Sequence, residues 1–170
     1  FQPDPKSISN AITAKTRAVL LNSPNNPTGA VYSPGTLKTI LELCRKHKIW
    51  VISDEVYSEI ATEGFTPIAS LPGNHEQTVT ISSLSKSHRM TGWRCGWMIG
   101  NEKLTRHLTN LNLCMNYGLP PFIQDASCKA LEKDHITAKK VKKRLDSNRK
   151  ILRHELKNMQ RTKLFAEGGG

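Results

Sequence analysis

Short runs of apolar and β-branched residues recur through the first hundred residues of the chain. They cover residues 17–22, 49–53, 78–82 and 95–99, and each has the length of a single strand. The run at 49–53 is almost continuously apolar, which is typical of a strand in a parallel sheet rather than a half-exposed one. The pattern therefore predicts four strands.

A helical repeat separates the first two of these runs. Ser33 followed by Pro34 is a helix start, because serine caps the first turn and proline suits its first position. The apolar residues that follow recur at helical spacing, at Leu37, Ile40, Leu41 and Cys44. Alternation of strand, helix and strand favours the α/β class, with a mostly parallel sheet and helices on both faces.

The second half of the chain reads as helical. Residues 102–116 and 122–133 form two predicted helices, separated by a Gly- and Pro-containing turn at 118–121. Residues 136–159 carry a narrow apolar stripe at helical spacing, which predicts one long helix. The stripe consists of Val141, Leu145, Leu152, Leu156 and Met159.

Positive charge is concentrated on this long helix. The net charge of the chain is +11. Residues 134–163 contain 11 basic and 3 acidic residues, which supplies +8 of that total. Such a segment can attract nucleic acid. We favour a solvated helix face and expect no nucleic-acid partner, because no aromatic residues for base stacking are interleaved with the basic ones.

Cysteine spacing and hydropathy exclude several classes of protein. The four cysteines contain no Cys-x-x-Cys pair, and the six histidines show no zinc-ligand spacing, so we expect no metal site. Reduced thiols suit a cytoplasmic protein. No apolar run approaches the ~20 residues of a membrane span. An organelle-targeting signal ahead of Phe1 stays an open alternative.

One segment carries the most specific chemistry. Residues 83–97 hold a lysine, Lys86, in a loop rich in serine and glycine, with Arg94 eight residues later. Two earlier segments accompany it, Asn22 to Gly29 (Asn-Ser-Pro-Asn-Asn-Pro-Thr-Gly) and Ser53 to Tyr57 (Ser-Asp-Glu-Val-Tyr). Asn26, Asp54 and Lys86 each follow the end of a predicted strand, where ligands bind in open α/β sheets.

Together the three segments resemble the class I/II aminotransferases, the fold-type I enzymes that use pyridoxal 5′-phosphate (PLP). The spacings agree with that family: 28 residues from Asn26 to Asp54, 32 from Asp54 to Lys86 and 8 from Lys86 to Arg94. The resemblance implies that residues 1–133 belong to the PLP-binding large domain. It implies that 134–170 comprise an interdomain helix and the start of a small domain, whose first strand begins near residues 165–169.

The resemblance also implies a role for each residue that faces the cofactor ring. Lys86 would hold PLP through a Schiff base and then, once displaced by the substrate amine, move a proton at the substrate α-carbon. Asp54 would keep the pyridine nitrogen protonated. Tyr57 and Asn26 would donate hydrogen bonds to the 3′ oxygen. Lys86, Asp54 and Tyr57 are thus the catalytic candidates.

Three further residues are implied as phosphate ligands. Arg94 would bind the phosphate as a two-pronged donor, and Ser83 and Ser85 would each add a hydroxyl. The turn at Asn26-Pro27 resembles a family turn with a cis peptide bond before the proline. His88 and Arg89 are assigned to loop structure, and Glu55 to a local cap or pair.

The function implied is transfer of an amino group between an amino acid and a 2-oxo acid, by a homodimer in the intact protein. Two alternatives stay open: another fold-type I PLP enzyme (a β-lyase, a cyclopropane-forming synthase or an oxidase), or an inactive isolated domain. Residues 116–121 lack the arginine that aspartate-specific members place nearby, which favours a neutral or basic substrate. Because family residues are expected on both sides of this chain, we expect the 170-residue chain alone to be inactive.

Overall fold

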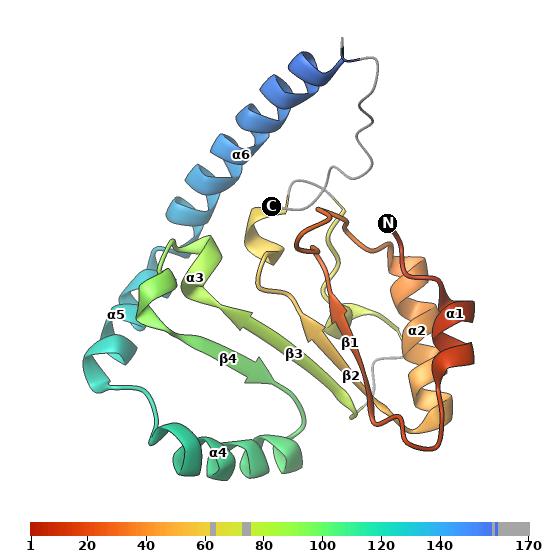
Figure 1. Ribbon diagram of the computed structural model, residues 1–170. Helices are drawn as coiled ribbons and strands as arrows, with labels where there is room; N and C mark the ends of the chain where they lie inside the picture. Colours follow the sequence, from red (N-terminus) through yellow and green to blue (C-terminus); the bar gives the residue numbers. More distant parts are fainter. Residues whose placement is uncertain (62–63, 73–75, 158, 160–170) are drawn as a thin grey trace.

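Four strands form one sheet in the order in which they occur along the chain. The computed structural model describes residues 1–61, 64–72, 76–157 and 159. The strands are β1 (Ala18–Asn22), β2 (Trp50–Asp54), β3 (Thr78–Ser83) and β4 (Gly96–Ile99). The sheet order is β1-β2-β3-β4 (Figure 1). All four predicted strands are therefore present, with ends within one residue of those expected.

The sheet is mixed. β1 pairs with β2 and β2 with β3 in parallel, whereas β4 pairs antiparallel with β3. β4 runs the other way because the chain after β3 turns back at the same end of the sheet, through the short helices α3 (Leu84–Ser87) and η3 (Thr91–Trp93). A parallel neighbour would need a crossover to the opposite end. The α/β class and the mostly parallel sheet are confirmed.

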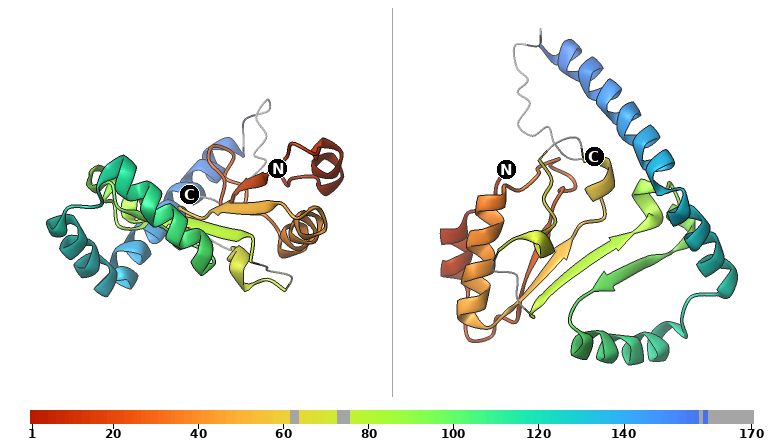
Figure 2. Two further views of the ribbon diagram at one scale, coloured as in Figure 1. Left: turned by 90° about the horizontal axis from the view of Figure 1, so that it is seen from below. Right: turned by 180° about the vertical axis from the view of Figure 1, so that it is seen from behind.

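In the part of the chain that the structure describes, six α-helices of 4 to 23 residues accompany the sheet. α1 (Pro5–Ala11) and α2 (Pro34–His47) lie together beside β1 and β2, and α4 lies below β4 (Figures 1 and 2). The later helices are α4 (Glu102–Asn116), α5 (Pro121–Glu132) and α6 (Asp134–Leu156). Two short 3-10 helices, η1 (Ser58–Ile60) and η2 (Ile68–Ser70), follow β2.

The predicted start of α2 is confirmed in detail. Ser33 is its N-cap, and the Ser33 Oγ accepts a hydrogen bond from the Thr36 N–H at 3.1 Å. Lys48 ends the helix in the left-handed conformation. By contrast, α1 was not predicted, because it is short and buries no residue fully. Its signal was an Asp4-Pro5 start, in which the Asp4 side chain accepts hydrogen bonds from the Lys6 and Ser7 N–H groups.

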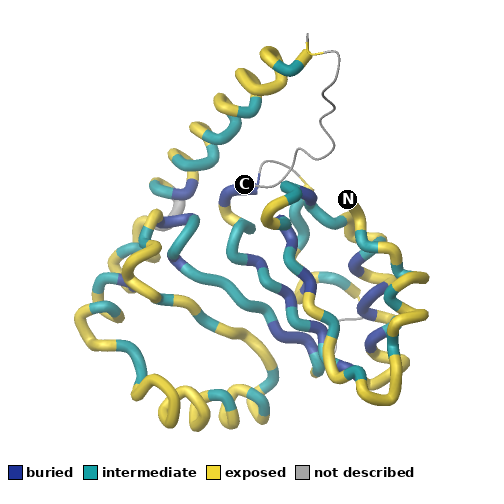
Figure 3. The backbone as a smooth tube through the Cα atoms, viewed as in Figure 1, coloured by how far each residue is buried: buried dark blue, intermediate teal, exposed yellow. Residues whose placement is uncertain are grey.

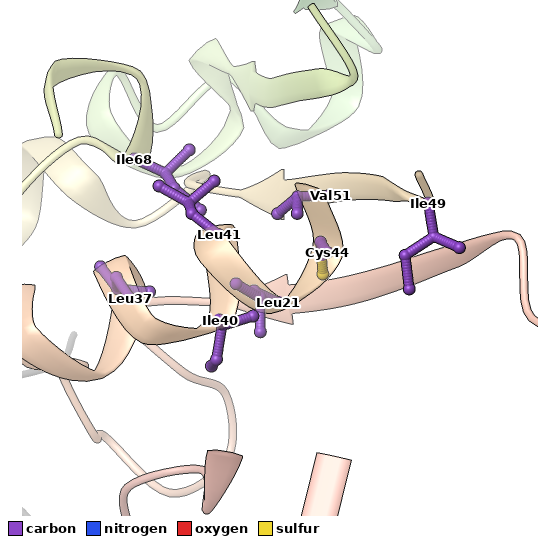
Figure 4. Packing of buried hydrophobic residues seen from close by; sticks show 8 residues of the cluster. All are labelled: Leu21, Leu37, Ile40, Leu41, Cys44, Ile49, Val51 and Ile68. Carbon is purple, nitrogen blue, oxygen red and sulfur yellow. The ribbon is translucent and has the colours of Figure 1, made fainter. Parts of the chain in front are cut away.

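The hydrophobic core lies between α2 and one face of β1 and β2. Its eight buried residues are Leu21, Leu37, Ile40, Leu41, Cys44, Ile49, Val51 and Ile68 (Figure 4). The four apolar positions predicted for α2 are all among them. On the opposite face of β1, Leu20 is 68% exposed, so the core of the described chain is one-sided (Figure 3).

The long helix α6 packs through its first half only. It contacts η1 and α3, and its Ala138 is buried. In the predicted stripe, Val141 and Leu145 are half-buried while Leu152 is exposed. α6 begins at Asp134, where the sequence places the end of the large domain; that division stays a prediction, and the strand expected near 165–169 lies outside the described residues.

No helix in the described part of the chain has both the length and the apolar character needed to span a membrane.

Truncating the core should destabilise the fold measurably. Leu41 is completely buried between α2 and the sheet, so we expect Leu41→Ala to lower the free energy of unfolding by roughly 2–5 kcal/mol. Lys38→Ala, one turn earlier on the same helix, is the matched control. Its side chain is about half exposed in a weak pair with Glu42, and we expect a change within ~0.5 kcal/mol. Denaturant unfolding of both variants measures the difference; equal losses would contradict this core.

Cys44 should be inert in the native protein. Burial raises the pKa of its thiol from 9.0 to about 11, so at pH 8 only roughly one thiol in a thousand is the reactive thiolate. Cys114 and Cys128 are exposed. We expect iodoacetamide at pH 8 to label the exposed cysteines in the native state and Cys44 only after unfolding, as mapped by mass spectrometry. Native labelling of Cys44 at the rate of Cys114 would count against this packing.

Candidate active site

The predicted site residues gather where β1, β2 and β3 end. In the parallel register, Asn22 at the end of β1 lies opposite Asp54 at the end of β2. Asp54 in turn lies opposite Ile81 of β3, and Lys86 follows the end of that strand by three residues. Asn26 and Lys86 follow strand ends at this edge of the sheet, as expected, and Asp54 is itself the last residue of β2.

Lys86 lies over Tyr57. The Lys86 Nζ is 5.5 Å from the centroid of the Tyr57 ring, a cation–π distance. Both side chains are half-buried. Within the described chain the amine forms no ion pair, so its contact with Tyr57 leaves it available to a ligand. Two segments about 30 residues apart are thereby brought into one place.

The short helix α3 fixes the direction of Lys86. The Ser83 Oγ caps α3 by accepting a hydrogen bond from the Ser85 N–H at 3.3 Å. Leu84 is buried, and its N–H donates to the Cys95 carbonyl, which ties α3 to the segment before β4. With Leu84 and Ser87 facing inward, Lys86 lies on the more open side of the turn.

Asp54 is held mainly through its backbone. Its carbonyl accepts hydrogen bonds from the Ser23 N–H at 3.1 Å and the Asn22 Nδ2 at 3.3 Å. Its Oδ1 accepts one hydrogen bond, from the Val56 N–H at 3.1 Å. The carboxylate is half-buried and retains acceptor capacity for a protonated ring nitrogen.

The turn that carries Asn26 is closed by its own hydrogen bonds. The Asn25 Oδ1 accepts from the Thr28 N–H at 3.2 Å and the Thr28 Oγ1 at 2.6 Å. The peptide bond before Pro27 is cis, as predicted, and so is the bond before Pro24. Asn26 itself is exposed, and no residue of the described chain accepts or donates a hydrogen bond to its side chain.

Asn22 joins these two parts of the site, a role that the sequence did not reveal. Its Oδ1 accepts from the Asn26 N–H at 2.9 Å, while its Nδ2 donates to the Asp54 carbonyl. One amide side chain thus links the turn after β1 to the end of β2. The only signal in the sequence was a polar residue at the end of an apolar run.

The three predicted phosphate ligands share one cavity. Ser83, Ser85 and Arg94 line a cavity of about 550 Å³ between β3, β4 and α4. Arg94 adopts the left-handed conformation, and its guanidinium donates to the Thr91 carbonyl at 2.9 Å. A guanidinium with two hydroxyls is a donor set that suits a phosphate.

Lys86, Asp54 and Tyr57 do not line this cavity. The two groups of residues adjoin at α3, where Ser85 faces the cavity and Lys86 is the next residue. Gly96 allows β4 to come this close to β3: a Cβ at Gly96 would lie 3.0 Å from the Ser82 carbonyl oxygen and 3.2 Å from the Ser83 Cβ.

His88 belongs to the loop structure, as expected, whereas Glu55 reaches beyond the local cap or pair that the sequence suggested. His88 is buried, and its Nδ1 lies 2.8 Å from the Ser87 Oγ. Glu55 is also buried, and its Oε1 accepts hydrogen bonds from the Ser53 Oγ at 3.0 Å and the Ile68 N–H at 2.9 Å. Burial raises the pKa of the Glu55 carboxyl, and the neighbouring charge of Asp54 adds to the shift.

The residues present fit PLP as a group. They comprise an amine without an ion pair in the described chain, a carboxylate with spare acceptor capacity, a phenol and an exposed amide. Beside them lies the cavity with its guanidinium and two hydroxyls. An amine that bonds an aldehyde, an acid for a ring nitrogen and a set of phosphate donors are the contacts this cofactor requires.

Comparison with known proteins identifies the family of the chain. The family model "Aminotransferase class I and II" matches residues 1–169. The chain is 53% identical over 133 residues to an arginine–pyruvate transaminase of Pseudomonas aeruginosa. This match covers 78% of this chain and 34% of the transaminase. It is 39% identical over 136 residues to an aspartate aminotransferase of Thermotoga maritima, covering 79% of this chain and 36% of the relative.

Solved structures show the same fold. The crystal structure of the aspartate aminotransferase from Thermotoga maritima superposes with a TM-score of 0.92 at 34% identity, covering 99% of this chain and 44% of that one. N-succinyldiaminopimelate aminotransferase from Mycobacterium tuberculosis gives a TM-score of 0.91 at 31% identity, covering 100% and 44%. The chain spans about a third of the length of the curated relatives it matches. In sequence and in fold, this chain belongs to the class I and II aminotransferases, a family that is generally PLP-dependent.

Proposed function

We propose that the protein is a PLP-dependent aminotransferase that moves an amino group between an amino acid and a 2-oxo acid. The observation that carries the proposal is the position of the Lys86 amine, 5.5 Å from the Tyr57 ring at the edge of the sheet where Asp54 ends β2. Membership of the family supports the same reaction.

Each residue of the ring side has a separate task. The Lys86 amine would hold the cofactor aldehyde covalently and, once the substrate amine has displaced it, would move the proton at the substrate α-carbon. The Asp54 carboxylate keeps the ring nitrogen protonated by accepting its hydrogen bond. Tyr57 and Asn26 donate hydrogen bonds to the phenolic oxygen. When bound, PLP supplies the electron sink for the pair left at the α-carbon.

The phosphate side anchors the cofactor. Arg94 donates two parallel hydrogen bonds to a phosphate, and Ser83 and Ser85 add hydroxyl donors. Because Ser83 caps α3 and Ser85 lies within it, the same short segment sets part of the anchor and the direction of Lys86. Orienting a reactant in this way lowers the barrier, because the freedom of motion is lost on binding rather than during the reaction.

We propose that the intact protein is a homodimer. Several apolar side chains of α4 and α5 are exposed in the described chain, which supports a covered surface there: Leu111, Leu113, Met115 and Phe122. Tyr117, between the two helices, is 92% exposed and in the left-handed conformation.

A basic amino acid is the amino donor that we favour. The arginine–pyruvate transaminase is the relative at 53% identity, and residues 116–121 contain no arginine to pair with a substrate side-chain carboxylate. Burying a substrate side-chain carboxylate without a positively charged partner weakens binding. A basic or neutral substrate side chain does not carry this penalty.

Lys86→Ala should remove catalysis and the covalent cofactor attachment together. In the protein expressed from its complete gene, we expect transamination to fall by roughly 10²–10⁴-fold, the usual contribution of a positioned acid–base group. Borohydride reduction followed by peptide mapping should find PLP on Lys86 in the wild type and none in the variant. Lys46→Ala, an exposed lysine on α2, is the matched control and should behave like the wild type. PLP retained on another lysine would refute the assignment.

A substrate panel separates the donor classes. We expect kcat/KM for L-arginine with pyruvate to exceed that for L-aspartate with 2-oxoglutarate by about tenfold or more, corresponding to ~1.4 kcal/mol or more of differential binding. Ammonia is measured in the same reactions, because a lyase or oxidase releases ammonia where an aminotransferase forms a new amino acid. Faster turnover of L-aspartate would overturn the donor assignment and leave the reaction type standing.

A further inference from the structure

We propose that Glu55 is a positioning residue for the cofactor site, whose buried carboxyl group fixes the turn that carries Asp54 and Tyr57. The inference rests on the proposed function, because it concerns how those two side chains meet PLP. Glu55 itself touches neither the cofactor nor the substrate in this proposal. It acts through its two neighbours in the sequence.

Strand alternation separates Glu55 from Asp54. Side chains of successive residues point to opposite faces, so Val51, Ser53 and Glu55 share the face that packs against α2. Val51 belongs to the hydrophobic core, and Glu55 is only 5% exposed. Asp54 lies on the other face. A charged residue type therefore occupies a core-facing position directly beside the ring-binding acid.

The Glu55 side chain connects two parts of the chain. Its Oε1 accepts from the Ser53 Oγ at 3.0 Å, within its own strand, and from the Ile68 N–H at 2.9 Å, at the start of η2. Ile68 is fully buried in the core. The carboxyl group thus ties the end of β2 to an element that is itself anchored, so that neither end of the connection is free to move.

The Glu55 backbone is equally constrained. Its N–H donates to the Ile81 carbonyl of β3 at 2.9 Å, which continues the β2–β3 pairing one residue past Asp54. Its carbonyl accepts from the Ser58 N–H at 2.9 Å, in the turn that begins η1. Tyr57 lies inside that turn. Four hydrogen bonds therefore hold the residue between the two ring-facing side chains.

Packing alone does not account for a glutamate here. Burying a carboxyl group is unfavourable unless it is hydrogen-bonded, and an apolar residue would fill the same space without that cost. Burial raises the pKa of the Glu55 carboxyl, because the charged form is disfavoured away from water. Its two accepted hydrogen bonds offset the cost and add direction, which an apolar side chain cannot supply.

The described residues supply Glu55 with four hydrogen-bond partners. These partners lie between Ser53 and Ile81. Residues that the structure describes therefore hold both the side chain and the backbone of Glu55.

The test compares three substitutions at Glu55 with one nearby. Glu55→Gln keeps an oxygen acceptor for both hydrogen bonds. Glu55→Ala removes the acceptor, and Glu55→Asp keeps the charge on a side chain one methylene shorter. Glu59→Ala is the matched control, because Glu59 is exposed in the same segment. All are made in the protein expressed from its complete gene.

Three measurements distinguish positioning from stability. They are the Kd for PLP, the pH midpoint of the absorbance band of bound PLP, and the Tm of the cofactor-free protein. We expect Glu55→Ala and Glu55→Asp to raise the Kd about tenfold or more and to move the midpoint by about half a unit or more, because Asp54 and Tyr57 set the charge state of the ring. Glu55→Gln and Glu59→Ala should stay within about twofold of the wild type.

The outcomes separate the two proposals. A lower Tm for Glu55→Ala and Glu55→Asp with unchanged Kd and midpoint would make Glu55 a purely structural residue and overturn the inference. If Glu55→Ala does not fold, the Glu55→Asp result decides in the same way. A wild-type protein that binds no PLP, or binds it equally well after Lys86→Ala, would overturn the proposed function and with it this inference.

Discussion

The parallel pairing of β2 with both β1 and β3 is the constraint on which the rest of the structure depends. Parallel strands end at the same edge of a sheet, so the turn after β1, the end of β2 and the lysine helix after β3 have to meet. The register then decides which residues meet. Asn22 opposite Asp54 is the pair that lets one amide side chain link the Asn26 turn to the end of β2.

The two faces of β2 have different roles: one packs against α2, and the other carries a residue of the candidate site. Val51, Ser53 and Glu55 face α2 and the core, while Asp54 faces the other way. The hydrophobic core and the candidate site therefore lie on opposite faces of β2. This arrangement limits the movement of Asp54, because any shift of β2 would disturb the packing of α2 and the Glu55 connection to η2.

The α3 turn has a similar double role on the neighbouring strand. Leu84 and Ser87 are buried, whereas Ser85 faces the cavity that Arg94 also lines and Lys86 faces Tyr57. Four consecutive residues thus combine packing with the phosphate binding and covalent attachment that we propose. The antiparallel return of β4, made possible by Gly96, brings Arg94 back to this turn.

The sequence by itself determined the strands, the α2 helix and the candidate residues, because these depend on neighbours within a few positions. Ser33 with the helical spacing of Leu37, Ile40 and Leu41 predicted α2, and strand ends predicted where Asp54 and Lys86 lie. Only the tertiary structure decided the direction of β4, the link through Asn22 and the buried role of Glu55. The Asn22–Asp54 and Glu55–Ile68 contacts join residues 32 and 13 positions apart, and the direction of β4 depends on its pairing with β3. Such contacts follow from strand register and packing, which no local pattern of residues encodes.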